Sequence, residues 1–431
     1  MNRQIFNPIF SQNEYVPDGE PHVFGDRVYV YGSHDRFNGE SFCMENYTVW
    51  SAPVNDLTDW KNHGVSYDRF KDPHCTKETD YVYAPDCAQG ADGRYYLYYE
   101  ISMKPFVSVA VSDRPEGPFE YYGVVRYPDG TPAGTRDHDV FMFDPGVLRD
   151  DDGQVYLYCG FHPDLSKEPV FARAKEKYRM DGSYAFSLAD DMLTITEEHG
   201  RIRGGDFFEA SSMRKFDGRY YFIYSSQAKH ELKWAVSDQP AADFQDGGVL
   251  ISNGDLGLSD KRLNYTGNNH GSVELINGHY YVFYHRQTNK TNFSRQECAE
   301  KITFKNGVFE QAEMTSCGLN GKPLAAKGEY PARIACNLYS KDGAVEYGND
   351  GTPGIEDHPY LTQNKDGVQY IANMHEGSTA VFKYFDDLSD TKIKVNHTGK
   401  GEMEIKTDNH ALTFIYHGND AADFYSFSFA K

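Results

Sequence analysis

The sequence predicts an all-β protein in which a five-bladed β-propeller is followed by a C-terminal β-sandwich of the jelly-roll kind. A tight turn recurs every 60 to 67 residues, and each turn opens an aromatic strand of one type. A fixed period of this length indicates a repeat architecture, and a turn followed by a strand of period two indicates a β-hairpin. After about residue 325 the pattern changes to short irregular strands, which predicts the sandwich.

The repeat can be followed through five units. The turns contain Gly25, Gly93, Gly153, Gly218 and Gly278. The strands after them read VYVYGSHD, YYLYYEIS, VYLYCGFH, YYFIYSSQ and YYVFYHRQ. A third strand follows at a matching place in the first four units, and NFSRQECAEKITF supplies it in the fifth with a different sequence. We therefore place the propeller in residues 1–315 and the sandwich in residues 325–431.

Five side chains occupy equivalent places a few residues before each turn. They are Asp18, Asp86, Asp144, Glu209 and His270. The innermost strand of each blade faces the central channel, so we expect these side chains to be neighbours on the propeller axis. Burial and mutual repulsion separate the pKa values of carboxyl groups that share a channel. Acid and base catalysis needs one carboxyl group that keeps its proton and a second one that is ionised. Glycoside hydrolysis is the commonest reaction that uses such a pair.

Several of these residues have a structural alternative. An Asp beside a turn is commonly a cap or an Asx-turn former, and Asp86 in APDC fits that role best. His270 in NNHGSV is either a buried core histidine or a channel residue that holds water, a cation or sugar. Cys159 in VYLYCG fits a small packing residue better than a nucleophile.

Composition excludes some classes of function. With 43 basic and 64 acidic residues the net charge is −21, which argues against nucleic acid and anionic membranes as partners. The sequence shows neither an apolar run of membrane-spanning length nor a signal peptide, so we predict a cytoplasmic location unless a leader has been removed. Seven cysteines without a CxxC pair predict free, mostly buried thiols.

Five segments together resemble glycoside hydrolase family 43. They are PDGEPHVFGDRVYVYGSHD, APDCAQGADGRYYLYY, FDPGVLRDDDGQVYLYCG, FFEASSMRKFDGRYYFIYSS and NHGSVELINGHYYVFYHR. The resemblance covers roughly residues 5 to 310. It implies a five-bladed propeller enzyme that hydrolyses arabinose- or xylose-containing polysaccharides and oligosaccharides with inversion.

The resemblance also implies roles for three carboxyl groups. Asp18 matches the general base, Asp144 the residue that modulates the pKa of the acid, and Glu209 the general acid. The family has an Asp-Pro-Ser-like motif at the base, whereas Gly-Glu-Pro follows Asp18 here. Glu20, which directly precedes Pro21, therefore competes with Asp18 for this role. Inversion requires roughly 6.5 to 9.5 Å between the two working carboxyl groups.

Further residues are expected to contact the sugar. His270 matches a channel histidine that in several family members helps to hold a calcium ion or water. Arg286 in FYHR resembles an arginine that reaches the sugar pocket, and the alternative is that it pairs with surface carboxylates. Asp35 and Asp86 complete the predicted substrate-binding set. The chemistry needs no cofactor, and a structural Ca²⁺ ion in the channel, with His270 as a ligand, is the metal to expect.

The C-terminal part resembles a shortened carbohydrate-binding module of the family 6 type. The segments GTPGIEDHPYLTQ, FKYF and ALTFIYHGNDAADFYSFSF carry this resemblance. Tyr and Phe side chains of such a sandwich either stack on sugars or pack against the propeller, and we favour packing. A sandwich docked on the blade edges could also supply a wall of the active-site cleft.

The predicted function is an inverting, exo-acting α-L-arabinofuranosidase that releases arabinose side chains from arabinoxylan-derived saccharides. β-Xylosidase, alone or as a second activity, is the alternative, and endo-arabinanase is a third choice. Loop shape rather than the axial residues separates these substrates. A non-catalytic sugar-binding propeller is the alternative from another class, because fold does not settle function. Propeller sucrases and fructosidases are disfavoured, since the chain lacks their Asn-Asp-Pro-Asn start.

Overall fold

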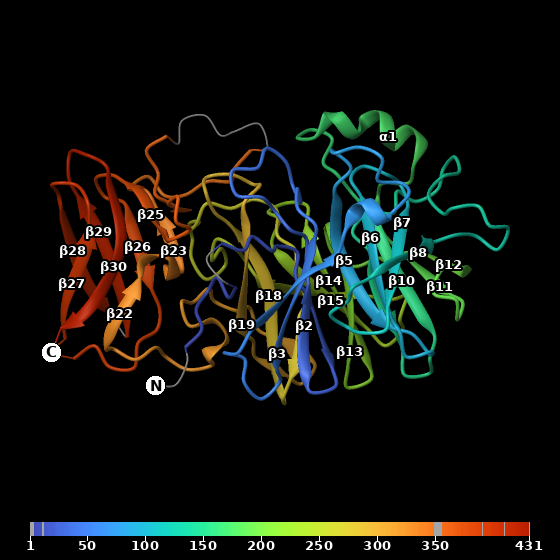
Figure 1. The fold of residues 1–431 in the computed structure, drawn as a ribbon, viewed down its shortest axis with the longest axis horizontal. Coiled ribbons are helices and arrows are strands. Elements are labelled where there is room, and N and C mark those ends of the chain that lie inside the picture. Colours follow the sequence, from blue (N-terminus) through green and yellow to red (C-terminus); the bar gives the residue numbers. More distant parts are fainter. Residues whose placement is uncertain (1–3, 11–12, 349–355, 390, 409, 431) are drawn as a thin grey trace.

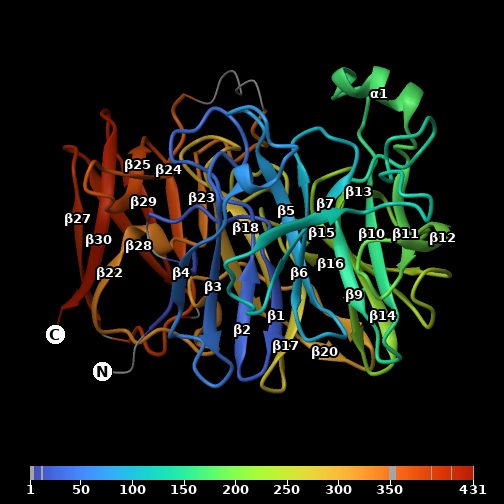
Figure 2. The same ribbon diagram turned by 45° about the vertical axis from the view of Figure 1, so that its right-hand side comes forward.

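The computed structural model describes residues 4–10, 13–348, 356–389, 391–408 and 410–430. It confirms the predicted fold class: five antiparallel sheets form a propeller, and two further sheets form a C-terminal β-sandwich beside it (Figure 1). Among the described residues the one α-helix is α1 (Ala172–Lys177), which lies at one end of the propeller in both views (Figure 2). Short 3-10 helices are η1 (Arg69–Lys71), η2 (Pro169–Phe171), η3 (Gly318–Asn320) and η4 (Ala332–Ile334).

The blades follow one another along the chain. Blade 1 contains β1 (Glu20–Phe24), β2 (Arg27–Tyr31), β3 (Tyr47–Pro53) and β4 (Lys61–Tyr67). Blade 2 contains β5 (Val82–Gln89), β6 (Tyr95–Ile101), β7 (Val107–Ser112) and β8 (Glu120–Val124). Blade 3 contains β9 (Gly146–Arg149), β10 (Val155–Phe161), β11 (Gly182–Leu188) and β12 (Ile195–Arg201).

The last two blades complete the ring. Blade 4 contains β13 (Phe207–Phe216), β14 (Arg219–Ser226), β15 (Leu232–Ser237) and β16 (Gln245–Ile251). The sheet of blade 5 contains β17 (Val273–Ile276), β18 (His279–Gln287) and β19 (Arg295–Lys301), and a small hairpin of β20 (Phe304–Lys305) and β21 (Val308–Phe309) follows it.

The recurring turns join the first two strands of each blade. In blade 1, for example, Phe24 pairs with Arg27, which leaves a two-residue hairpin turn. The five turn glycines have φ between 64° and 91°, a region that glycine adopts without steric cost. The period read from the sequence is therefore the spacing of these hairpins.

The ring closes between the first and last blades. Strand β1 contacts β5 on one side and β17 on the other, so the innermost strands surround one axis. Ile5, Ile9 and Phe10 of the N-terminal segment pack in a core cluster with side chains of blades 1 and 5. The backbone N–H of Ile9 also donates to the carbonyl of Glu297 in blade 5 at 2.9 Å. The N-terminal segment thereby seals the closure.

The C-terminal sandwich has two antiparallel sheets. One contains β22 (Gly328–Pro331), β24 (Tyr360–Gln363), β25 (Gln369–Met374), β27 (Lys392–His397) and β30 (Ala422–Ala430). The other contains β23 (Asn337–Tyr339), β26 (Thr379–Phe382), β28 (Glu402–Asp408) and β29 (Ala411–His417). Phe382, Phe414, Phe424 and Phe427 are buried between them. In the segment that carried the resemblance to a binding module, residues 351–355 lie outside the described residues.

Apolar side chains bury the contacts between blades as well as the sandwich interior. One cluster joins blades 2 and 3, and another joins blades 4 and 5 and reaches Cys336 of the C-terminal domain. All seven cysteines lie within the described residues, and all are free and buried, as predicted.

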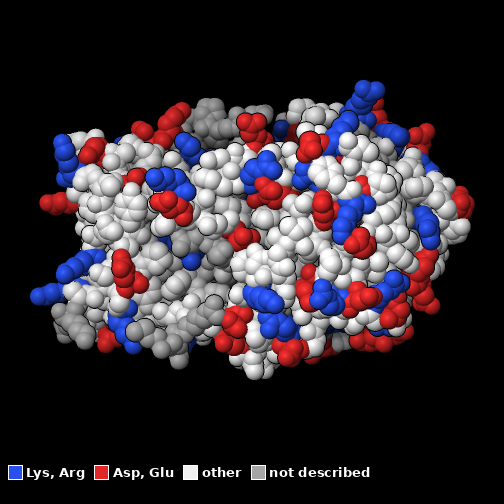
Figure 3. Space-filling view, viewed as in Figure 1, with Lys and Arg blue, Asp and Glu red and all other residues white. Residues whose placement is uncertain are grey.

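Charged side chains of both signs are scattered over the visible surface (Figure 3). On the face shown in Figure 3, Lys and Arg are scattered among Asp and Glu over both domains. No helix in the described part of the chain combines the length and apolar character needed to span a membrane.

Candidate active site

A cavity of about 890 Å³ is lined by residues from all five blades. Asp18 comes from blade 1, Asp144 from blade 3, Glu209 from blade 4 and His270 from blade 5. Each of these side chains is more than nine-tenths buried. Four of the five residues that the repeat register singled out are therefore neighbours at one cavity, although they are separated by up to 252 positions in the chain.

Backbone strain is concentrated at this cavity. Asp18 has φ 59° and Asp144 has φ 44°, and Ala210, directly after Glu209, has φ 67°. Non-glycine residues pay roughly 1–3 kcal/mol each for this left-handed conformation, and such residues cluster at functional sites. Strand β13 also carries register shifts on both sides of Glu209. Bulges of this kind re-aim a side chain, here into the cavity.

Asp18 is held as a carboxylate. Nη1 of Arg295 donates to its Oδ1 at 2.8 Å, while the same guanidinium binds both oxygens of Asp35 at 2.9 and 3.0 Å. Burial opposes ionisation of Asp18, but the charge of Arg295 holds its pKa well below the usual range. The backbone N–H of Asp18 donates to Nδ1 of His285 at 3.2 Å, which fixes the backbone next to the carboxylate. At neutral pH Asp18 is therefore a proton acceptor.

The pKa of Glu209 is shifted in the opposite direction to that of Asp18. Burial and the nearby charge of Asp144 raise the pKa of Glu209 well above its ordinary value. Asp144 lies next to it: its Oδ2 accepts a hydrogen bond from the backbone N–H of Ala210 at 3.0 Å. Burial raises the pKa of Asp144 itself to about 6. The protonated form of Glu209 is therefore favoured, in the same cavity as Asp18, whose ionised form is favoured.

His270 lies between two carboxyl groups. Its Nδ1 is 3.6 Å from Oδ2 of Asp144, and its Nε2 is 3.7 Å from Oε1 of Glu20. Burial disfavours the charged ring, but Glu20 and Asp144 together raise the pKa of His270 to about 9. The imidazolium thus places a positive charge beside Asp144. His270 is buried and lines the cavity, so of the two alternatives from the sequence its position fits the channel residue.

Comparison with known proteins shows the family of the chain. The family model described as glycosyl hydrolases family 43 matches residues 5–309, which span the whole propeller. The chain belongs to glycoside hydrolase family 43. A protein of Thermoclostridium stercorarium named xylosidase/arabinosidase is 44% identical, over 99% of each chain. The protein is thus a glycoside hydrolase.

Solved structures of family 43 enzymes share the fold. A β-xylosidase/α-arabinofuranosidase from a compost microbial metagenome, in complex with xylotriose and in a calcium-free form, is 26% identical with a TM-score of 0.54, and the match covers 70% of this chain and 96% of that one. An arabinoxylan arabinofuranohydrolase from Bacillus subtilis, in complex with cellotetraose, is 18% identical with a TM-score of 0.56, and covers 98% of this chain and 96% of that one. The second likeness extends the shared fold over both domains.

Glu20, the competitor of Asp18, is engaged elsewhere. Its Oε2 accepts from Nη2 of Arg214 at 2.7 Å and from Oγ of Ser212 at 3.0 Å. It is not among the described residues that line the cavity, whereas Asp18 is. The geometry therefore separates two candidates that the sequence left open.

Three predicted substrate-binding residues also lie outside the cavity lining: Asp35, Asp86 and Arg286. Asp35 binds Arg295. Asp86 lies 2.6 Å from Nε2 of His22 and accepts from the backbone N–H of Val147 at 2.7 Å, so it links blades 1, 2 and 3. Contact of Asp35, Asp86 and Arg286 with sugar stays a prediction. In this structure their side chains bind neighbouring parts of the protein.

Arg286, which the sequence suggested for the sugar pocket, does not line the cavity, whereas Arg295 does. Arg286 is buried at the domain boundary, where it donates to the carbonyl of Ala335 at 2.6 Å and to Asn264 at 3.1 Å, and neither partner is a surface carboxylate. Arg295, which the sequence reasoning missed, lines the cavity. One signal was available: Arg295 belongs to NFSRQECAEKITF, the predicted third strand of the fifth unit, and an arginine that is buried in a sheet requires a carboxylate partner.

The described side chains do not form a group of metal ligands that includes His270. Among the described residues, the ligand atoms close enough to share a metal belong to Glu20, His22 and Asp86, and His270 is not one of them. Arg214 already pairs with Glu20, and His22 with Asp86. A calcium ion in the channel with His270 as a ligand stays a prediction.

Proposed function

We propose that the protein hydrolyses terminal pentosides with inversion, with Asp18 as general base, Glu209 as general acid and Asp144 as the residue that keeps Glu209 protonated. One observation carries this proposal: a carboxylate held ionised by Arg295 and a carboxyl group held protonated by burial share one cavity. Groups whose pKa values are driven apart in this way perform acid and base catalysis on the same substrate.

The reaction follows from these charge states. Asp18 takes a proton from a water molecule as the water oxygen bonds to the anomeric carbon. Glu209 gives its proton to the glycosidic oxygen as the bond between that oxygen and the anomeric carbon breaks. Water and leaving group lie on opposite faces of the sugar, so the configuration inverts, and a proton then returns from Asp18 to Glu209 through solvent. We expect roughly 6.5 to 9.5 Å between the two carboxyl groups, which is the space an attacking water needs.

The apolar part of the cavity suits a sugar ring. Phe42, Phe143, Phe161 and Phe208 line it beside the carboxyl groups. Aromatic faces stack on the C–H faces of sugars, while a few polar groups orient the hydroxyls. This lining supports a saccharide substrate over a charged one.

For the sugar we propose α-L-arabinofuranoside, released from arabinoxylan-derived saccharides, with β-D-xyloside as a second activity. The second activity is favoured by the relative at 44% identity, whose name pairs xylosidase with arabinosidase. The two pentosides are near-isosteric, so one cavity can accept both. A structural calcium ion is not required for either reaction.

The test uses nitrophenyl α-L-arabinofuranoside, nitrophenyl β-D-xyloside and arabinoxylan, with sugar products separated by chromatography. We expect turnover by the wild type and a loss of roughly 100-fold or more in Glu209→Gln, while the exposed control Glu197→Gln keeps full activity. Proton NMR of the first product should show inverted configuration. Sugar binding without turnover of any pentoside would favour a sugar-binding propeller instead.

A further inference from the structure

We propose that the C-terminal domain completes the substrate cleft, and that Glu346 from this domain positions the saccharide unit that leaves with the glycosidic oxygen. This inference rests on the proposed function above. It concerns the loop between β23 and β24, of which Glu346, Tyr347 and Gly348 line the same cavity as Asp18 and Glu209.

The loop is joined to the propeller through backbone hydrogen bonds. The N–H of Thr266 donates to the carbonyl of Val345 at 3.2 Å, and the N–H of Tyr347 donates to the carbonyl of Thr266 at 2.8 Å. Nδ2 of Asn292, another cavity residue, donates to the carbonyl of Tyr347 at 3.1 Å. Glu346 therefore has a fixed place at the cavity wall.

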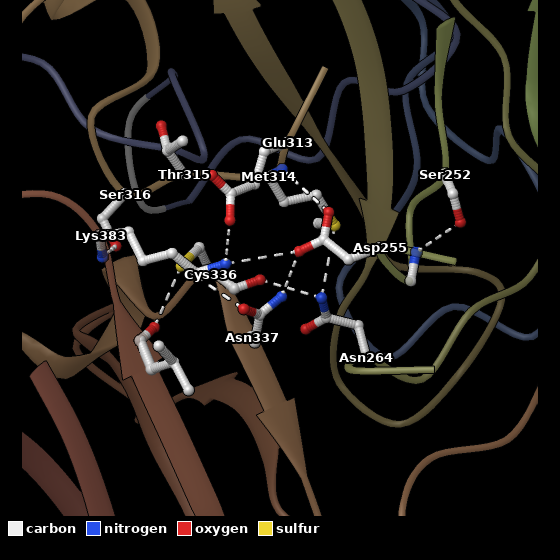
Figure 4. A network of polar contacts seen from close by, with 12 residues as sticks. Ser252, Asp255, Asn264, Glu313, Met314, Thr315, Ser316, Cys336, Asn337 and Lys383 are labelled. Carbon is white, nitrogen blue, oxygen red and sulfur yellow. Dashed lines mark hydrogen bonds and ion pairs between the residues drawn. The ribbon is translucent and has the colours of Figure 1, made fainter. Parts of the chain in front are cut away.

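The domain that carries the loop is itself anchored by a buried polar network (Figure 4). Asp255 of the propeller accepts from Nδ2 of Asn337 at 2.7 Å and lies 3.7 Å from Nζ of Lys383. Nζ of Lys383 also donates to Glu313 at 2.7 Å. A satisfied buried network of this kind specifies one orientation of the two domains. The cleft wall is thus tied to the propeller through this network.

Glu346 keeps acceptor capacity that the protein does not use. Its Oε2 accepts from Nη2 of Arg262 at 3.2 Å, and its Oε1 lies 3.5 Å from Nε2 of His230. Burial lowers the pKa of His230 to about 4, so this ring is neutral and forms no ion pair with Glu346 at neutral pH. The Glu346 side chain is 32% exposed. A carboxyl group with about four acceptor sites and one close donor can accept from sugar hydroxyls.

The position of Glu346 indicates which sugar it meets. The ring of His230 packs edge-on against Phe208, with centroids 4.6 Å apart, and Phe208 directly precedes Glu209. Contacts therefore lead from Glu346 through His230 to the strand that carries Glu209. The leaving group takes its proton from Glu209, so the ligand we assign to Glu346 is a neutral pentose unit next to the cleaved bond.

A matched pair of substrates tests this assignment. In xylotriose and in an arabinoxylo-oligosaccharide the leaving group is a sugar, whereas in a nitrophenyl pentoside the leaving group is nitrophenol. For Glu346→Gln and Glu346→Ala we expect kcat/KM on the oligosaccharides to fall roughly 10- to 100-fold, mainly through KM, and to stay within about twofold on the nitrophenyl pentosides. Glu356→Gln, an exposed position in the same loop, is the control and should match the wild type on every substrate.

Two outcomes would overturn the inference. Equal losses on both substrate types, with a lower melting temperature, would show that Glu346 only neutralises Arg262. Unchanged kinetics on both would show that it touches no substrate.

A binding measurement separates this inference from the proposed function. Calorimetry with xylotriose compares Glu209→Gln with the double variant Glu209→Gln/Glu346→Gln, and we expect the double variant to bind at least tenfold more weakly. Equal binding rejects the role of Glu346 whether or not pentosides are hydrolysed. If the wild type binds xylotriose but hydrolyses no pentoside, the proposed hydrolysis is rejected. The comparison of binding by the single and double variants still tests the role of Glu346 in that case.

Discussion

Arg295 of blade 5 donates to Oδ1 of Asp18 before blade 1 at 2.8 Å, and both side chains are buried. The contact crosses the closure of the ring, since it joins the last blade to the first. The same guanidinium pairs with Asp35, so one cation compensates two carboxylates. Closure of the propeller is therefore a condition for the charge state of Asp18 as well as for stability.

Arg295→Lys should move the acid limb of the pH profile of kcat/KM to higher pH. Lysine keeps the positive charge, but its ammonium group cannot bind two carboxylates as the planar guanidinium group of arginine does. The pKa of Asp18 therefore rises. Because Asp18 must be ionised to act, the acid limb of kcat/KM shifts to higher pH, with a loss of roughly 10- to 100-fold near neutrality. Nitrophenyl pentoside kinetics across pH measure this. An acid limb that stays in place would show that Arg295 does not set the charge of Asp18.

Asp144→Asn should move the alkaline limb of the pH profile of kcat/KM to lower pH. The charge of Asp144, present above pH about 6, raises the pKa of Glu209. Its removal lowers that pKa, so Glu209 loses its proton earlier and the alkaline limb shifts to lower pH. The control is Asp152→Asn in the exposed turn of the same blade, which should leave the profile unchanged. A shift to higher pH in Asp144→Asn would contradict the assignment.

Glu300→Gln should flatten the dependence of stability on pH. Burial raises the pKa of Glu300 to about 8 from its ordinary 4.5, so the folded state keeps a proton that the unfolded chain has lost. Stability therefore falls as pH rises from about 4.5 to about 8. Gln resembles the protonated form and does not titrate.

Denaturant unfolding at pH 5 and pH 8 measures the effect. The wild type should lose roughly 1–3 kcal/mol more than Glu300→Gln between these values. An equal loss in both proteins would mean that Glu300 does not carry the proton.

Lys383→Met should loosen the domain boundary. The substitution leaves Asp255 and Glu313 facing each other without the cation between them. Breaking a buried pair in this way costs about 3–5 kcal/mol, so thermal unfolding should begin at a lower temperature. Lys406→Met, at an exposed pair with Glu404, is the control and should change stability by about 0.5 kcal/mol or less. Similar effects of both substitutions would show that the network does not hold the domains together.

Local pattern was enough to predict the blades and the axial positions. The hairpin turns depend on residues adjacent in sequence, and a repeat places the same register position at the same radius in each blade. Asp18, Asp144, Glu209 and His270 could therefore be named without coordinates. Arg286 and Arg295 show where this reasoning ends. They lie on the paired strands β18 and β19, where Arg286 is opposite Gln296 and Arg295 is opposite Gln287, so their side chains project from opposite faces of the sheet. Which of the two faces borders the cavity depends on how the blade sits in the ring.

The sequence by itself determined the fold class, the five-blade register and the set of carboxyl groups that meet on the axis. Tertiary structure decided which of Asp18 and Glu20 faces the cavity, which carboxyl group lies beside a buried arginine, and that a loop of the sandwich forms part of the cleft wall. The physical reason is that a pKa and a cavity wall depend on burial and on distances of a few ångströms. Here those distances join residues as far apart in the chain as Asp18 and Arg295, and no local pattern encodes them.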